Sequence, residues 1–185
     1  MRATTEQQTR KGRRKILNVF SLSLFNLNNS TSPAKNVILA GVKAVVLHDH
    51  RPTTARDLGA NFYLTESDFG KNRAEACRAK LAELNVAVHV TALATDGPLT
   101  PEQVLSLEDC DVLVLTEAAT ADAARLDECC RSRKNKENGE QPCPISFIRA
   151  DARGVFAAVF CDFGDQFVVD DVDGEEPATG IGKRR

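Results

Sequence analysis

The sequence has no tryptophan, a single tyrosine (Tyr63) and only 5% aromatic residues. A surface on which several bases of single-stranded nucleic acid could stack is therefore not expected. The apolar stretches are far shorter than the ~20 residues that a membrane-spanning helix requires. The six cysteines include no C-x-x-C pair, so the spacing typical of a structural zinc site is missing. These absences argue against nucleic-acid, membrane and metal partners, and reduced thiols favour the cytoplasm and nucleus.

The formal charge of −2 is unevenly distributed along the chain. Six basic residues and one acidic residue lie in the first 15 positions, and the last three residues are all basic. Of 24 basic and 26 acidic residues, 15 and 25 remain between these two ends, which gives the body a charge of −10. An acidic body disfavours non-specific nucleic-acid binding and suits a basic protein partner.

This distribution divides the chain into three expected segments. Residues 1–33 are predicted to be a basic, disordered leader, residues 34–178 one folded domain, and residues 179–185 a basic tail. The leader is open to three interpretations, namely an Arg-rich transit peptide, a nuclear signal, and a solvated tail or gene-model artefact.

Short apolar runs alternate with helical patterns through the body of the chain. Such alternation predicts an α/β fold, a three-layer Rossmann-like arrangement with a mostly parallel sheet. The expected helices cover residues 34–40, 71–84 and 121–133. The runs expected to form the central strands are Lys43–Leu47, Val86–Val90, Asp111–Leu115 and Ile145–Ile148.

Two further segments are expected at the margins of this sheet. Ile16–Leu27 alternates in part and is predicted to form an edge strand. Val155–Cys161 and Gln166–Val169 are predicted to form a closing antiparallel hairpin, with Gly164 in its turn. Aromatic and β-branched residues gather without interleaved charge at 62–64 and 155–163, so we expect an exposed apolar face there.

Several single positions carry specific expectations. Gly41 stands where a helix would end in the left-handed conformation, and Asp68 is a plausible N-cap of the helix over 71–84. His48 and His50 would point to opposite faces of a strand, so a shared ligand role is not expected. The vicinal pair Cys129–Cys130 lies in a predicted helix, where one thiol should pack inward and the other face solvent.

The most informative motifs lie between Lys35 and Leu84. A helix ends at Gly41, a strand ends at the acidic Asp49, and an acidic-x-Gly-Lys helix start follows (DFGKNRAE, residues 68–75). A second block covers 151–164 (DARGVFAAVFCDFG), and DGEEP follows at 173–177. These blocks resemble the family that activates ubiquitin and its relatives, which is built on the ThiF/MoeB nucleotide fold. The resemblance covers residues 34–178.

The resemblance also implies which parts of the family's chemistry are missing. An adenylating repeat has a G-x-G-x-x-G turn for phosphate and an Asp-x-Asp for ribose and magnesium. Here residues 26–33 read NLNNSTSP, and Asp49 stands alone in HDHR. Asp49, Lys71 and Arg73 therefore match degenerate nucleotide-site positions. The alternatives are a turn residue for Asp49 and solvated first-turn residues for Lys71 and Arg73. No catalytic or metal-binding residue is assigned.

By this resemblance the chain is the first, non-adenylating repeat of a ubiquitin-activating enzyme. ATP and magnesium would bind the active repeat, and this chain would hold no cofactor. The expected partners are that active repeat, in cis or in trans, and ubiquitin or a ubiquitin-like protein. Two alternatives remain open, a small regulatory subunit of a SUMO-type activating enzyme and a stand-alone nucleotide-fold binding domain.

Overall fold

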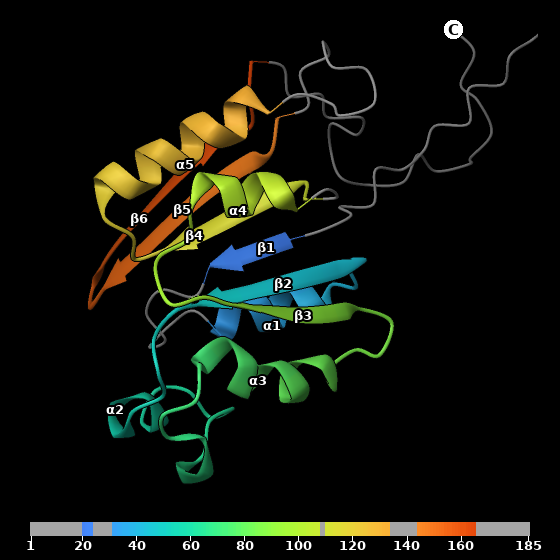
Figure 1. Ribbon diagram of the computed structural model, residues 1–185, viewed down its shortest axis with the longest axis vertical. Helices are drawn as coiled ribbons and strands as arrows, with labels where there is room; N and C mark the ends of the chain where they lie inside the picture. The colour runs from blue at the N-terminus through green and yellow to red at the C-terminus, as the bar shows by residue number, and fades with distance from the viewer. Residues whose placement is uncertain (1–19, 24–30, 108–109, 134–143, 166–185) are drawn as a thin grey trace, which may run out of the picture.

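A computed structural model describes residues 20–23, 31–107, 110–133 and 144–165 (Figure 1). Its strands are β1 (Phe20–Ser23), β2 (Ala44–Asp49), β3 (His89–Ala94), β4 (Val112–Thr116), β5 (Ser146–Arg153) and β6 (Phe156–Asp162). Its helices are α1 (Thr31–Leu39), α2 (Ala55–Leu58), the 3₁₀ helix η1 (Glu66–Asp68), α3 (Arg73–Ala82), α4 (Pro101–Ser106) and α5 (Thr120–Ser132).

The strands form one sheet in the order β3-β2-β1-β4-β5-β6. Strands β1 to β5 pair in parallel, and β6 runs antiparallel to β5. The chain crosses from β3 on one side of β1 to β4 on the other, as in doubly wound nucleotide folds. The predicted α/β fold with a mostly parallel sheet is confirmed.

Helices cover both faces of the sheet, with α4 and α5 in front of it and α1 behind (Figure 1). Strand β4 shows why the sheet is buried on both sides. Val112 and Val114 join a core with residues of α1 and α3, whereas Leu113 and Leu115 join a second core with α5. Successive side chains of a strand point to opposite faces, so a fully apolar run suits a strand covered twice.

The helix boundaries follow local capping chemistry. Gly41 has a φ of 79°, and its amide donates to Ile38 O at 3.0 Å, as expected for the residue that ends α1. The N-cap of α3 is Asn72 rather than Asp68, because the Asn72 side chain accepts hydrogen bonds from the amides of Ala74 and Glu75. Asp68 instead ends η1. The expected helix over 71–84 is therefore shorter at both ends.

Two of the predicted strands are placed differently in the structure. Strand β3 begins at His89 instead of Val86, whose side chain is 95% exposed, and it lies at an edge of the sheet instead of at its centre. Strand β1 pairs with both β2 and β4, so the segment expected at an edge lies at the centre. β1 and the start of α1 also lie within the range 1–33, most of which is outside the described residues.

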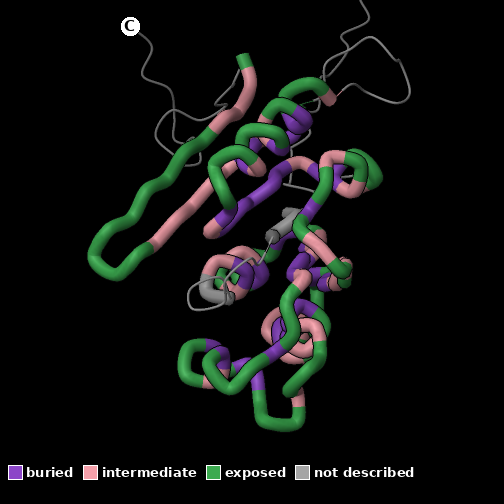
Figure 2. The backbone as a smooth tube through the Cα atoms, turned by 60° about the vertical axis from the view of Figure 1, so that its left-hand side comes forward, coloured by how far each residue is buried: buried purple, intermediate pink, exposed green. Residues whose placement is uncertain are grey.

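The antiparallel hairpin is formed by β5 and β6, with Gly154 (φ 62°) in its turn. The predicted partner of β6, Gln166–Val169, lies outside the described residues. The hairpin projects from the body of the molecule, and β6 is exposed along most of its length (Figure 2). Among the described helices, none is long and apolar enough to cross a membrane.

Candidate nucleotide-fold site at the end of β2

The candidate site begins with Asp49, the last residue of β2. Its side chain is fully buried, and the amide of Arg51 donates to its Oδ1 at 2.9 Å. The backbone oxygen of Asp49 accepts a hydrogen bond from Asn72 Nδ2 at 2.5 Å. Carboxyl ends of parallel strands are where ligands bind in open α/β sheets, so the position is the one that the sequence indicated. The conformation of the Asp49 side chain, however, is set by hydrogen bonds and ion pairs to neighbouring residues of the same chain.

Arg73 is the principal neighbour of this carboxylate. Its Nη2 lies 2.9 Å from Asp49 Oδ2, and its Nη1 lies 2.9 Å from Asp57 Oδ1. Arg73 is only 2% exposed, so the expectation of a solvated first-turn residue is wrong. A planar guanidinium can bind two carboxylates at once, which explains how one cation holds both.

Asp57 is positioned by the short helix α2. Its Oδ2 accepts hydrogen bonds from the amide and the hydroxyl of Thr54, each at 2.7 Å, which closes a capping box. Burial alone would raise the pKa of Asp57, but the Thr54 hydrogen bonds and Arg73 outweigh burial and lower it. Burial is the dominant effect at Asp49 and raises its pKa, although the Arg51 amide and Arg73 oppose the shift.

The two ends of the loop between β2 and α3 are joined to each other by backbone hydrogen bonds. The amide of Thr53 donates to Lys71 O at 2.8 Å, and the amide of Gly70 returns to Thr53 O at 3.0 Å. Gly70 has a φ of 78°, a conformation that other residues adopt at a steric cost. Because these hydrogen bonds bring the two ends of the loop together, Arg73 lies beside the end of β2, although 24 positions separate it from Asp49.

Lys71 lies apart from this buried cluster. Its side chain is 57% exposed and its Nζ donates to Asp68 Oδ1 at 3.0 Å. Asp68 also accepts from the Thr65 side chain and amide, and these hydrogen bonds, with that from Lys71, lower the pKa of Asp68 to about 2. The structure therefore brings Asp49 and Arg73 together and places Lys71 at the surface.

His48 precedes the site on β2 and is fully buried. Its Nε2 lies 2.7 Å from Thr95 Oγ1, the first residue after β3. Burial, with a smaller contribution from His50, lowers the pKa of His48 to about 4, so its ring is neutral at pH 7. In the part of the chain that the structure describes, no three His, Cys, Asp or Glu side chains are grouped to hold a metal ion.

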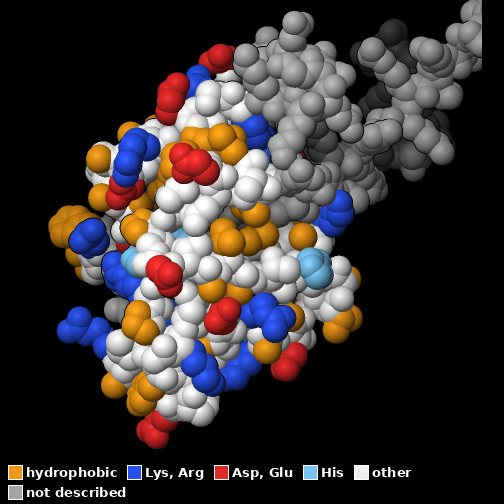
Figure 3. All heavy atoms as spheres, in the orientation of Figure 1, with side chains coloured by type: hydrophobic (Ala, Val, Ile, Leu, Met, Phe, Trp, Pro, Cys, Tyr) orange, Lys and Arg blue, Asp and Glu red, His pale blue; other side chains and the backbone are white. Residues whose placement is uncertain are grey.

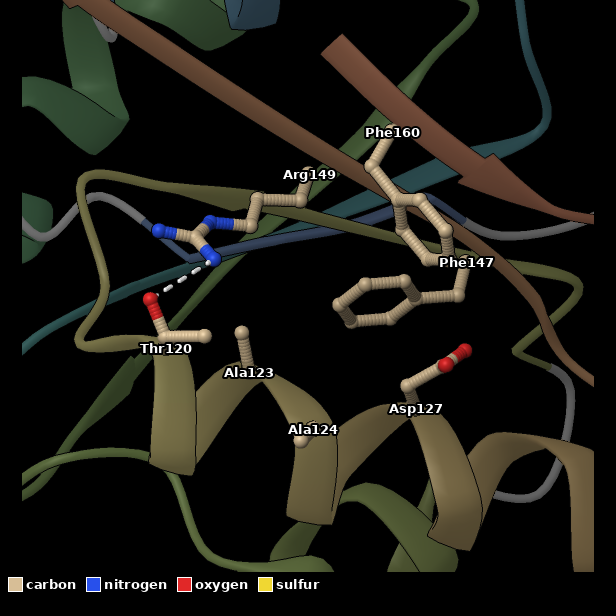
Figure 4. A pocket seen from close by; sticks show the side chains of 7 residues that line it. All are labelled: Thr120, Ala123, Ala124, Asp127, Phe147, Arg149 and Phe160. Carbon is tan, nitrogen blue, oxygen red and sulfur yellow. Dashed lines mark hydrogen bonds between the residues drawn. The ribbon is translucent and has the colours of Figure 1, made fainter. Parts of the chain in front are cut away.

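Helix α5 and strands β5 and β6 form a separate groove that the sequence did not reveal. A groove of about 300 Å³ lies between α5 and the β5–β6 hairpin. Figure 4 shows the rings of Phe147 and Phe160 above the helix, with Arg149 at one end of the groove and Asp127 at the other. Arg149 donates to Ala118 O at 3.1 Å, which fixes it at the start of α5.

The vicinal cysteines of α5 also differ from expectation. Cys129 and Cys130 are both buried, so neither thiol faces solvent. Burial raises the pKa of each thiol, and that of Cys77 is raised to about 11 for the same reason. Such thiols are poor nucleophiles near neutral pH.

At the end of β2, Arg73, Asp49 and Asp57 form a closed ion-pair cluster. Both carboxylates that could bind a ribose hydroxyl or a magnesium ion already contact Arg73. Opening this cluster would leave buried charges without their partner. The residues present therefore do not fit a bound Mg²⁺–ATP, and no catalytic step is assigned to them.

With this geometry established, comparison with known proteins identifies the family. The profile of the ThiF family matches residues 31–156, which is most of the chain. The chain belongs to the ThiF family. The match begins with α1, so the central strand β1 precedes it.

Several curated relatives are far longer than this chain. The chain is 51% identical to ubiquitin-activating enzyme E1 2 of Arabidopsis thaliana and 49% identical to ubiquitin-activating enzyme E1 1 of Triticum aestivum. It is 43% identical to ubiquitin-like modifier-activating enzyme 1 of Homo sapiens. Each alignment spans 148 residues and 80% of this chain, but only 12% or 13% of the relative.

Solved structures share the fold at much lower sequence identity. Escherichia coli MccB with succinimide aligns with a TM-score of 0.56 at 16% identity, over 74% of this chain and 38% of that one. The selenomethionine form of PaaA aligns with a TM-score of 0.58 at 14% identity, over 74% and 41%. These similarities show a ThiF/MoeB-like α/β fold.

Proposed function

We propose that this chain serves as a non-catalytic scaffold repeat of an ATP-dependent ubiquitin-activating enzyme. The observation that carries the proposal is the closed cluster of Arg73 with Asp49 and Asp57. An adenylating site needs a free carboxylate near the phosphates and a preorganised cation for the transition-state charge. Here the candidate carboxylate and the candidate cation neutralise each other.

The sequence identity to ubiquitin-activating enzymes supports a role in ubiquitin activation. The alignment covers only 12% or 13% of those relatives, which supports a role as one part of such an enzyme. In this proposal, ATP and magnesium bind an adenylating repeat of the same family, in cis or in trans. Ubiquitin or a ubiquitin-like protein is the substrate of the pair, and the cytoplasm and nucleus are the proposed location. The free thiols of the described cysteines take no part in thioester formation.

The β5–β6 hairpin offers a surface for that partner repeat. Beyond Ile148, which packs against the first core, its face opposite α5 carries no charged side chain and is formed by Ala150, Ala152, Ala157, Val159 and Cys161. The charged residues Arg149, Asp151 and Arg153 all lie on the α5 side, because side chains alternate along a strand. A flat, uncharged face of this kind suits the core of a protein–protein interface.

The distribution of surface charge on the rest of the face in view does not indicate a nucleic-acid partner. Basic and acidic side chains are interspersed over the face of the molecule that Figure 3 shows, with apolar side chains between them. A nucleic-acid-binding surface would instead gather basic residues in one patch or stripe. The face in view therefore adds no support for a phosphate-backbone partner.

The test has two arms, activity and association. With ubiquitin, ATP and Mg²⁺, the full chain should catalyse no ATP–pyrophosphate exchange above a heat-killed control, whereas the complete Triticum aestivum enzyme serves as the positive control. The chain should also co-purify with an isolated adenylating repeat of that enzyme. Val159→Glu should abolish the complex, and Val86→Glu, at another exposed valine, should preserve it. Exchange activity in the chain, or no complex with the repeat, would refute the proposal.

A further inference from the structure

The groove between α5 and the β5–β6 hairpin has apolar walls. The small side chains of Ala123 and Ala124 on α5 leave the space open, and the rings of Phe147 and Phe160 close it from the hairpin side (Figure 4). These two rings meet edge-on, with their centroids 6.3 Å apart. A hollow of about 300 Å³ lies at the lower end of the range of small-molecule sites, which are mostly apolar with a few placed polar groups.

The two ends of this groove carry opposite charges. At one end, Arg149 donates from Nη2 to Ala118 O at 3.1 Å and from Nη1 to Thr120 Oγ1 at 3.4 Å, so its guanidinium is held beside the start of α5. Asp127 lines the other end. Thr120 and Asp127 are seven positions apart on α5, so the ends are separated by about 10 Å at a rise of ~1.5 Å per residue.

Asp127 has an acceptor atom that the described protein leaves unused. Its Oδ1 is buried and has no hydrogen-bond partner among the described residues. Arg131, one helical turn further along α5, is engaged by Asp162 and Asp165. Burial, with Asp162 and Glu128 nearby, raises the pKa of Asp127, although Arg131 opposes the shift. A buried acceptor without a partner is costly, so a donor that enters the groove would be stabilised here.

We infer that this groove binds a small molecule with a primary amine at one end, a compact aromatic body and a hydrogen-bond acceptor at the other end. The ammonium group would donate to Asp127, and the acceptor would take a hydrogen bond from Arg149. The ring would lie over Ala124, against the edges or faces of the two phenylalanine rings. A purely apolar ligand would leave the Asp127 acceptor unpaired, and an anion would be repelled by it.

This site lies on the α5 side of the hairpin. The uncharged face proposed for the partner repeat lies on the opposite side, because side chains alternate along a strand. Occupancy of the groove therefore does not require the partner repeat, and the inference is independent of the proposed function.

Titration calorimetry of the full chain with tyramine tests the chemistry of the ligand. Tyramine carries a primary amine, an aromatic ring and a phenolic oxygen, and tyrosol is the matched probe in which a hydroxyl replaces the amine. Tyramine should bind one site with a Kd of about 1 mM or below, and tyrosol at least about tenfold more weakly. Asp127→Asn should weaken tyramine binding by about tenfold and leave tyrosol binding unchanged, because only the amine uses the carboxylate charge.

Two alanine variants of α5 test the location. Ala124→Leu should fill the groove and abolish binding of both probes, whereas Ala121→Leu, at an exposed position outside the groove, should preserve it. Tyramine should raise the Tm of the unmodified chain and of Ala121→Leu but not that of Ala124→Leu, and the melting transition itself shows that each variant folds. No saturable tyramine binding, equal affinity for both probes, or binding that survives Ala124→Leu would overturn the inference.

Discussion

Arg73 Nη2 lies 2.9 Å from Asp49 Oδ2, and both side chains are almost completely buried. The pair joins the first residue of α3 to the last residue of β2, and Asp57 adds a second carboxylate to the same guanidinium. Breaking a buried ion pair from one side leaves an uncompensated charge, which costs more than the pair itself contributes. The stability of this half of the domain therefore depends on Arg73.

Replacing Arg73 tests this dependence directly. Arg73→Met should lower the free energy of unfolding by about 3–5 kcal/mol, measured by urea denaturation, because two carboxylates lose their shared cation. Lys71→Met, two positions away at an exposed ion pair, is the matched control and should shift the midpoint only slightly. Adding Asp49→Asn to Arg73→Met should recover part of the loss. Equal midpoints for both single variants would contradict this account.

His48 should make stability depend on pH in a defined window. Its folded-state pKa of about 4 lies below its usual 6.5, so between these values the unfolded chain binds more protons than the folded one. Stability from this residue is therefore full above pH 6.5 and falls as the pH drops toward 4, by about 3 kcal/mol at most. Urea denaturation between pH 7 and pH 4 measures it. His48→Gln should flatten the slope in this window.

Two aromatic residues of β6 should respond differently to the same substitution. Phe156→Asp should increase solubility and monomer content and change stability by less than about 0.5 kcal/mol, since its ring is mostly exposed. Phe160→Asp should also lower stability, by about 1–2 kcal/mol, because the Phe160 ring packs edge-on at 6.3 Å from Phe147. Light scattering and thermal denaturation measure the two effects. Identical stability losses would show that the two rings have equivalent environments.

The described cysteines should divide sharply in their reactivity. Cys161 is exposed, whereas Cys77, Cys110, Cys129 and Cys130 are buried. Under native conditions iodoacetamide should label Cys161 at least tenfold faster than the other four, as read site by site by mass spectrometry, because buried thiols are inaccessible and burial disfavours the thiolate. Labelling in urea should bring the rates together. Fast native labelling at Cys130 would show that α5 opens readily.

Sequence patterns predicted those elements in which the residue types match the burial and the backbone conformation that the structure shows. The run around Leu113 predicted β4 because every residue of that strand is buried, and Gly41 predicted the end of α1 because its conformation is left-handed. The start of β3 was misplaced because Val86 is apolar yet lies in an exposed turn. The central place of β1 depends on pairing with strands distant in sequence, which no local pattern encodes.

The candidate site was predicted in its positions but not in their relationship. Asp49 and Arg73 were singled out, but no local pattern indicated that they contact each other. That contact depends on how the loop through Thr53 and Gly70 folds back. Asp57, which completes the cluster, carried one usable signal, the Thr-x-x-Asp spacing from Thr54 that is typical of a capping box. The groove beside α5 arises from the β5–β6 pairing and had no equivalent signal.

The four-residue strand β1 has a consequence for how this domain unfolds. In the described sheet it is the only backbone connection between the pair β2–β3 and the group β4–β5–β6. Its four residues pair with four residues of β2 on one side and with four residues of β4 on the other, and these pairings link the two halves. Loss of that strand would leave the two groups joined mainly by the core that Val112 and Val114 of β4 share with α1 and α3, so cooperativity between them would weaken. Amide exchange should then resolve two separate opening units where the intact sheet shows one.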